Sequence, residues 1–83
     1  MKTYINLGEM VRHRLKEIGM RQLELAERMD INKNTVTTML YSKDFSVSRL
    51  MELSKILRYN FFADIAKDLD VEEIIDYKQT KEI

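Results

Sequence analysis

The chain has 83 residues, of which 45% are hydrophobic and 34% charged, with no cysteine and a single histidine, His13. This length allows one domain with a small core, and the composition excludes disulfide bridges, thiolate metal sites and a histidine metal cluster. No apolar stretch approaches the roughly 20 residues of a membrane-spanning helix, and the first residues lack the apolar stretch of a signal peptide, so we expect a cytoplasmic protein.

The net charge of zero conceals an uneven distribution along the chain. Residues 1–60 contain 11 basic and 7 acidic residues, a net charge of +4, whereas residues 61–83 contain 3 basic and 7 acidic residues, a net charge of −4. The chain therefore has a basic body and an acidic C-terminal end, a distribution compatible with contact to nucleic acid despite the balanced total.

Apolar residues recur at helical spacing in five stretches. The first stretch ends at Gly19, a residue that favours the left-handed conformation of a helix C-cap. The absence of proline and the presence of only two glycines disfavour a β-rich fold. The five apolar stripes consist of Leu7, Met10, Val11, Leu15 and Ile18; Leu25, Ala26 and Met29; Val36, Met39 and Leu40; Leu50, Leu53, Ile56 and Leu57; and Phe61, Phe62, Ile65, Ala66 and Leu69.

Three polar residues stand where helices should begin. Asn32, Ser46 and Asn60 each precede an apolar stripe, and their side chains can accept a hydrogen bond from a backbone N–H of the first turn. Ile31 and Val36 have the spacing of a hydrophobic staple around Asn32. The sequence therefore predicts an all-α fold, a compact bundle of about five helices.

The predicted domain covers residues 1–69 and is followed by an acidic extension, residues 70–83. Val71, Ile74 and Ile75 could form one apolar helical turn, whereas the residues from Tyr77 onward lack periodicity. We expect this extension to be partly frayed or to lie at a dimer interface. Its acidic residues either only keep the protein soluble or hold this end of the chain away from a polyanion.

The segment 19–41 predicts a helix-turn-helix, with helices over about 21–29 and 33–41 joined by a tight turn at 30–32. Ala26 is small enough to let the two helices cross closely, and Val36 can dock the second helix onto the core. The other faces of the second helix carry short polar side chains and one charge. Such a helix suits a DNA major groove, where base edges are read. The polar residues are Lys33, Asn34, Thr35, Thr37 and Thr38.

From about Leu7 to Ala66 the chain resembles the lambda-repressor-like, or Xre-type, helix-turn-helix regulators. The resemblance rests on the segments 22–29, 31–37 and 46–57, whose sequences are QLELAERM, INKNTVT and SVSRLMELSKIL. It implies a sequence-specific DNA-binding regulator, a repressor in the usual family role, that binds double-stranded DNA as a homodimer without a cofactor.

The resemblance also implies a role for single residues. It assigns base reading to the second helix of the motif and phosphate contacts to the residues around it, with Gln22 also supporting that helix. The base-reading positions are Lys33, Asn34, Thr37 and Thr38, and the phosphate-contacting positions are Gln22, Asn32, Tyr41, Lys43 and, with its added positive charge, Arg21.

The chain departs from the family pattern at three places. Asp30 replaces the usual turn glycine, and Arg21 replaces a Ser or Thr cap. Leu15 and Leu40 replace an arginine–glutamate pair, and since an apolar pair can substitute for a buried ion pair, we predict that these two leucines touch.

The sequence also bears on two other functions. The fold could serve as an antitoxin-like protein-interaction module that does not bind DNA, since residues 33–41 contain a single lysine; in that case these polar side chains would be an ordinary solvated face. An enzyme is not expected, because the chain lacks a cysteine, a glycine-rich phosphate loop and a nucleophile motif.

Overall fold

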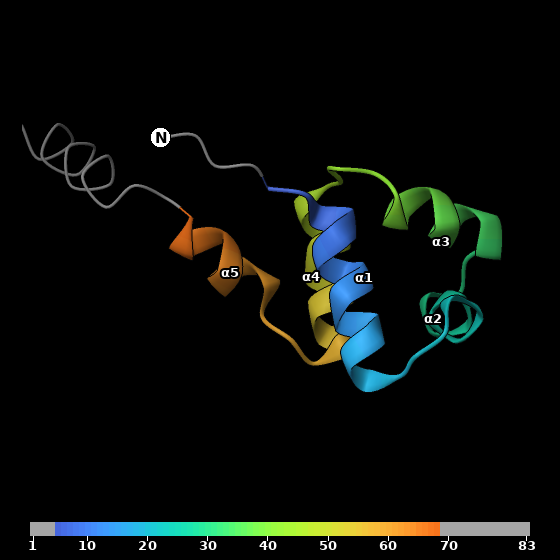
Figure 1. The fold of residues 1–83 in the computed structure, drawn as a ribbon. Helices are drawn as coiled ribbons and strands as arrows, with labels where there is room; N and C mark the ends of the chain where they lie inside the picture. The colour runs from blue at the N-terminus through green and yellow to red at the C-terminus, as the bar shows by residue number, and fades with distance from the viewer. Residues whose placement is uncertain (1–4, 69–83) are drawn as a thin grey trace, which may run out of the picture.

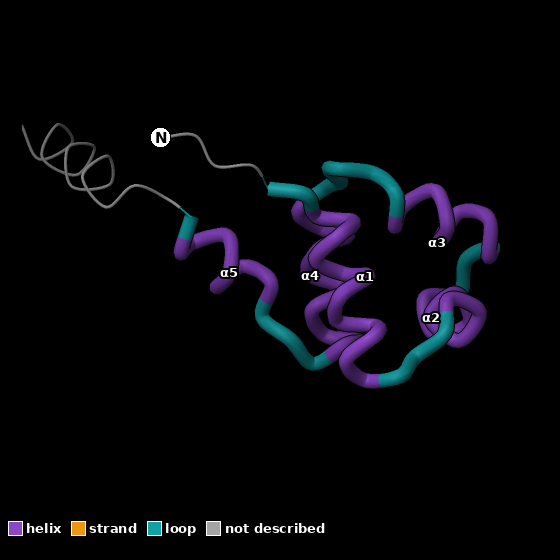
Figure 2. The backbone as a smooth tube through the Cα atoms, viewed as in Figure 1, coloured by secondary structure: helices purple, strands orange, loops and turns teal. Residues whose placement is uncertain are grey.

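The computed structural model describes residues 5–68, which form five α-helices and no strand (Figures 1 and 2). The all-α prediction is confirmed. Residues 69–83 lie outside the described part, and with them Leu69 and the whole predicted acidic extension, so the division into 1–69 and 70–83 stays a prediction. The helices are α1 (Leu7–Ile18), α2 (Gln22–Met29), α3 (Lys33–Leu40), α4 (Val47–Leu57) and α5 (Phe61–Lys67).

The three predicted N-caps are all formed. The Asn32 side chain accepts from the backbone N–H of Asn34 at 2.6 Å, Ser46 Oγ accepts from the backbone of Arg49 at 3.1 Å, and Asn60 caps α5 in the same way. Each cap satisfies a donor that the helix itself leaves without a partner. These local bonds determine where α3, α4 and α5 begin.

Left-handed residues end three of the helices. Gly19 has φ 69° after α1, as its position predicted. Asp30 has φ 58° after α2, so the aspartate adopts the conformation that a glycine usually provides at this turn. Arg58, at φ 52° after α4, was not anticipated from the sequence. Arg21 makes no side-chain cap bond to α2, which agrees with its expected weakness as a cap.

The hydrophobic core draws on all five helices, and no polar or charged residue of the described chain is buried. In Figure 1, α1 and α4 lie side by side in the centre, α2 and α3 lie on one side of them, and α5 lies on the other. The buried residues are Leu7, Val11, Leu15, Leu25, Ala26, Met29, Val36, Met39, Leu40, Leu50, Leu53, Leu57 and Phe61.

Two described residues of the predicted apolar stripes are exposed to solvent. Ile18 is 40% exposed, because it is the last residue of α1 and the chain turns away at Gly19 without covering the helix end. Ala66 is exposed near the end of α5. Leu15 and Leu40 both belong to the buried core; their direct contact stays a prediction.

Candidate nucleic-acid interface

Helices α2 and α3 form a compact unit around a short turn. The turn closes through the backbone N–H of Ile31, which donates to the carbonyl of Ala26 at 3.1 Å. Ala26 is 3% exposed and Val36 is fully buried, so the small residue and the docking residue both lie where the sequence predicted. This arrangement holds α3 by one face and leaves its other faces open.

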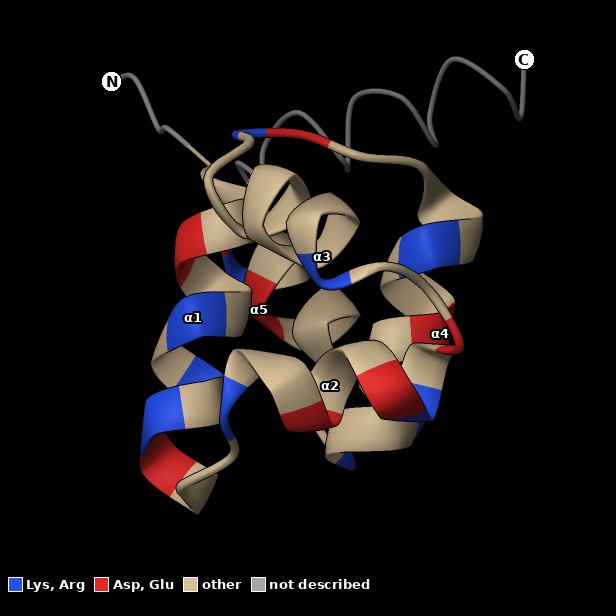
Figure 3. Cartoon of the chain, turned by 90° about the vertical axis from the view of Figure 1, so that its right-hand side faces the viewer, with Lys and Arg blue, Asp and Glu red and all other residues tan. Residues whose placement is uncertain are grey.

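The open face of α3 is polar and nearly uncharged. Lys33, Asn34, Thr35 and Thr38 are exposed, whereas Val36, Met39 and Leu40 are buried. Figure 3 views the molecule from the side of α2 and α3 and shows that charged residues are frequent on α1 and α2 but nearly absent from α3. Helix α3 therefore presents short side chains with hydrogen-bond donors and acceptors, while its opposite face is packed against the core.

One predicted base-reading residue is engaged inside the protein. The Thr37 hydroxyl lies 3.0 Å from Gln22 Oε1 and 3.2 Å from the carbonyl oxygen of Lys33, and its single proton can serve only one of them at a time. Thr37 and Gln22 are both half-buried. Gln22 thus supports α3 as expected, and Thr37 stands at the edge of the open face instead of within it.

Asn34 and Thr38 meet at a hollow between α3 and α4. The hollow has a volume of about 430 Å³, with Met39 and Phe45 among its apolar lining. Arg49 lies at its α4 side and pairs with Glu52 at 3.1 Å. Two of the four predicted base-reading residues therefore share one surface with a nearby cation.

The predicted phosphate-contacting residues lie around this unit and do not form one cluster. Arg21, Asn32, Tyr41 and Lys43 are exposed, and Tyr41 is 65% exposed. The Asn32 side-chain oxygen is occupied by the cap of α3. Lys43 lines the end of a groove between α1 and α5, whereas its chain neighbours Ser42 and Asp44 line the α3–α4 hollow.

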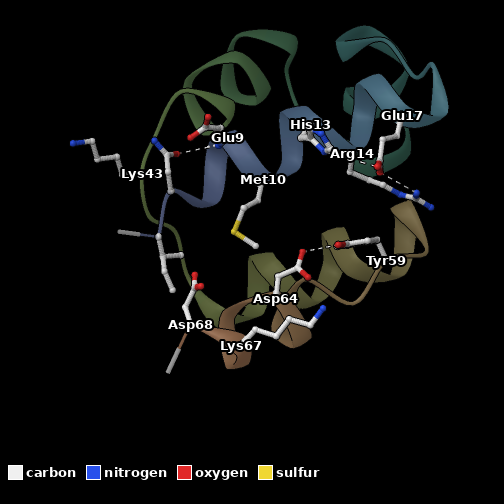
Figure 4. A pocket seen from close by; sticks show the side chains of 12 residues that line it. Glu9, Met10, His13, Arg14, Glu17, Lys43, Tyr59, Asp64, Lys67 and Asp68 are labelled. Atoms are coloured by element: carbon white, nitrogen blue, oxygen red, sulfur yellow. Dashed lines mark hydrogen bonds and ion pairs between the residues drawn. The ribbon is translucent and has the colours of Figure 1, made fainter. Parts of the chain in front are cut away.

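That groove is the larger of the two hollows, at about 690 Å³, and it carries charges of both signs (Figure 4). Met10 points into it from α1, and Tyr59 donates a hydrogen bond to Asp64 at 2.5 Å across its far end. The hydrogen bond to Asp64 raises the pKa of Tyr59 above 10.0, with partial burial and the negative charge of Asp64 acting in the same direction. Residues 5–68 contain no group of three His, Asp or Glu side chains placed to hold a metal ion.

Two arginines of α1 were missed by the sequence interpretation. Arg12 Nε donates to the carbonyl of Leu40 at 2.9 Å, and its guanidinium lies 4.6 Å from the centre of the Tyr41 ring. Arg14 Nε donates to the carbonyl of Leu57 at 3.1 Å. These contacts join residues 28 and 43 positions apart, so local spacing gave no sign of them.

Comparison with known protein families matches residues 10–71 to the Cro/C1-type HTH (helix-turn-helix) DNA-binding domain. The match covers 62 of the 83 residues. The chain belongs to this family. Searches of curated proteins and of solved structures gave no match.

Membership in the Cro/C1-type family confirms the resemblance seen in the sequence and identifies a DNA-binding regulator. The family is generally non-enzymatic, in line with the expectation that the chain is not an enzyme. No helix within residues 5–68 has the length and apolar character needed to cross a membrane.

Proposed function

We propose that this Cro/C1-type protein is a sequence-specific transcriptional repressor that binds double-stranded DNA as a homodimer, with α3 in the major groove. One observation carries the proposal. Helix α3 exposes Lys33, Asn34 and Thr38 while its opposite face is buried against the core. Side chains of this kind match the donor and acceptor pattern that distinguishes base pairs in the major groove.

In this proposal the residues of α3 read the bases and the residues around it position the protein. Lys33, Asn34, Thr37 and Thr38 would determine sequence preference, with Thr37 at the margin because Gln22 engages its hydroxyl. Contacts to phosphates would fix the register of the protein without selecting a sequence. The proposed phosphate-contacting residues are Gln22, Asn32, Tyr41, Lys43 and Arg21.

The shortness of the reading helix supports a homodimer. Helix α3 has 8 residues and is only about 12 Å long, so one copy can read only a few base pairs. Two copies related by a twofold axis would read half-sites roughly 34 Å, or one helical turn, apart. A dimer of this kind placed across a promoter would repress by occupying the DNA.

The first test is fluorescence anisotropy with a labelled random-sequence duplex at about 50 mM and about 200 mM salt. We expect binding at the lower salt that weakens steeply at the higher salt, because phosphate contacts release counterions. Site selection from a random pool should then give a palindromic site. Absence of binding at about 50 mM salt would refute the proposal and favour the protein-interaction alternative.

Two further measurements test the finer parts of the proposal. Sedimentation of the protein with its selected duplex should give two chains per duplex; one chain per duplex would refute the homodimer. A reporter gene whose promoter contains the selected site should be expressed less when the protein is present. Increased expression would contradict repression and leave DNA binding intact.

A further inference from the structure

We propose that Arg12 and Tyr41 form a binding subsite for one backbone phosphate of the DNA. The inference deepens the proposed function and rests on it, because the phosphate would belong to the duplex that α3 reads. It adds α1 to the interface, a helix for which neither the sequence interpretation nor the family match assigns a DNA contact.

The subsite is built at the C-terminal end of α3. The Arg12 guanidinium is held from one side by the Leu40 carbonyl at 2.9 Å and lies over the Tyr41 ring at 4.6 Å from its centre. Tyr41 follows the last residue of α3 and is 65% exposed. The arginine is half-buried, so its long side chain is fixed before any ligand arrives.

The charge of Arg12 is available for an anion. Within residues 5–68, Arg14, Arg28 and Arg49 each pair with a carboxylate, whereas Arg12 has no acidic partner. Its Nε is used by Leu40, which leaves the four N–H groups of the two terminal nitrogens. A fixed guanidinium with free terminal nitrogens can bind two oxygens of one phosphate at once.

The loop that carries Tyr41 is also fixed to α1. The backbone N–H groups of Leu7 and Gly8 donate to the carbonyls of Lys43 and Ser42 at 2.9 and 3.0 Å. Arg12 lies four residues after Gly8, and hence on the same face of α1. The position of the subsite relative to α3 is therefore determined by backbone contacts as well as by the arginine itself.

Arg14 provides a matched control within the same helix. It contacts the end of α4 as Arg12 contacts the end of α3: its Nε donates to the Leu57 carbonyl, and its guanidinium lies 5.2 Å from the centre of the Tyr59 ring. However, Arg14 pairs with Glu17 at 3.4 Å and lines the groove between α1 and α5, away from the reading face of α3. Loss of either arginine changes the net charge equally.

The experiment compares the salt dependence of DNA binding for wild type, R12Q and R14Q. Glutamine can still donate a hydrogen bond to a nearby carbonyl but carries no charge. Each bound chain would lose one phosphate contact, so we expect R12Q to lower the slope of log K against log salt by about 0.9 per bound chain, and to weaken binding roughly tenfold per bound chain at about 0.1 M salt. The loss should be equal on the selected and the random duplex, because a phosphate contact carries no sequence information. R14Q should keep the wild-type slope.

The outcomes separate this inference from the proposed function. Salt-independent or absent binding by the wild type would refute the proposed function itself. A steep wild-type slope that R12Q leaves unchanged, or that R12Q and R14Q lower equally, would refute the subsite alone. Should R12Q not fold, labelling of wild-type arginines with phenylglyoxal gives the answer: duplex should slow modification of Arg12 and not of Arg14, and equal modification of Arg12 with and without duplex would overturn the inference.

Discussion

At the scale of single residues, Gly8 controls how closely α1 approaches the end of α3. A Cβ atom on Gly8 would lie 2.3 Å from the backbone oxygens of both Leu40 and Ser42. These are backbone atoms, so they cannot move aside as the end of a side chain could. The glycine therefore permits the short distance over which α1 hydrogen-bonds to the loop carrying Tyr41 and Lys43.

Gly8→Ala should destabilise the protein although alanine is the better helix former. The helix propensity gain is about 1 kcal/mol, whereas forcing a methyl group into backbone atoms costs about 1–3 kcal/mol and occasionally more. We expect the free energy of unfolding, measured by urea denaturation, to fall by up to about 2 kcal/mol. Because the loop must shift, DNA affinity should fall as well under conditions where the variant is folded.

Gly19→Ala is the control for this prediction. Gly19 has φ 69° but open space around the site of a Cβ atom, so the substitution costs only the left-handed backbone strain, about 1 kcal/mol. DNA affinity should be unchanged. Equal effects of the two substitutions on DNA binding would show that the approach of α1 to the loop does not position the interface.

Tyr59 gives a prediction for alkaline pH. Its pKa is raised in the folded protein because it donates a hydrogen bond to Asp64, so folding favours the protonated phenol. The stabilisation is complete below the unfolded pKa of 10.0 and is lost as the pH rises through the higher folded pKa. Wild-type stability should therefore fall more steeply above pH 10 than that of Tyr59→Phe, which keeps the ring against Arg14 and Phe61.

Urea denaturation at several pH values between about 8 and 11 checks this prediction. Tyr41→Phe is the comparison variant, since Tyr41 is exposed and makes no bond to a carboxylate among the described residues. Parallel stability curves for wild type and Tyr59→Phe across this range would contradict the link between Tyr59 and Asp64.

At the scale of elements, helix α3 gives different roles to two asparagines that look alike in the sequence. The Asn32 side chain caps the helix, whereas Asn34 contributes its backbone N–H to that cap and leaves its side chain exposed. Asn34→Ala should therefore fold normally and lose about 1–3 kcal/mol of discrimination at one base pair. Binding to the selected duplex and to duplexes altered one base pair at a time would measure this loss.

Asn32→Ala should behave in the opposite way. Removal of the cap costs about 1 kcal/mol of stability, which thermal or urea unfolding would detect. Base preference should be retained, since the Asn32 side chain is proposed to face a phosphate. If Asn34→Ala weakened binding to every sequence equally, the assignment of Asn34 to base reading would be wrong.

The same helices show what sequence reasoning could and could not supply. Caps such as Asn32, Ser46 and Asn60 depend on residues two or three positions away, so their spacing predicted them. The contact between Arg12 and Leu40 depends on how two helices pack, which local spacing does not encode. Periodicity placed Ile18 on the correct face of α1 but could not indicate that no element within residues 5–68 covers the end of that helix.

The candidate site likewise combines features that the sequence predicts with features that only the tertiary structure reveals. The family pattern indicated that Gln22 supports α3, and the bond to Thr37 agrees with it. The same bond turns the Thr37 hydroxyl inward, which could not be inferred because Thr37 and Gln22 are 15 residues apart. Which polar side chain of a helix meets a ligand therefore depends on tertiary contacts even when the helix itself is predictable.

At the scale of the whole molecule, α1 connects the reading helix to the rest of the core through two similar arginine contacts. Arg12 binds the end of α3, and Arg14 binds the end of α4 together with its pair to Glu17. Every buried residue of the part of the chain that the structure describes lies within residues 7–61. We therefore expect the fold to be independent of residues 70–83.

Deletion of residues 70–83 tests this expectation together with the two interpretations of the acidic extension. The deleted segment contains two basic and five acidic residues, so the net charge changes from zero to +3. If the extension only adds solubility, the shortened protein should unfold at nearly the wild-type temperature, keep its dimer on DNA, and bind random duplex as the wild type does; tighter binding would show instead that the acidic end is repelled by the phosphates. Circular dichroism melting, sedimentation and anisotropy measure the three quantities.

A dimer interface built from the apolar residues of the extension gives a different result for the same deletion. The shortened protein would still fold and bind random duplex, but its chains would bind the two half-sites independently, and affinity for the palindromic site would fall to that of a single half-site. Val71→Asp in the 83-residue chain distinguishes lost apolar contact from lost negative charge, because it disrupts an apolar surface while making the end more acidic. Dimers retained in both variants would place the interface within residues 1–69.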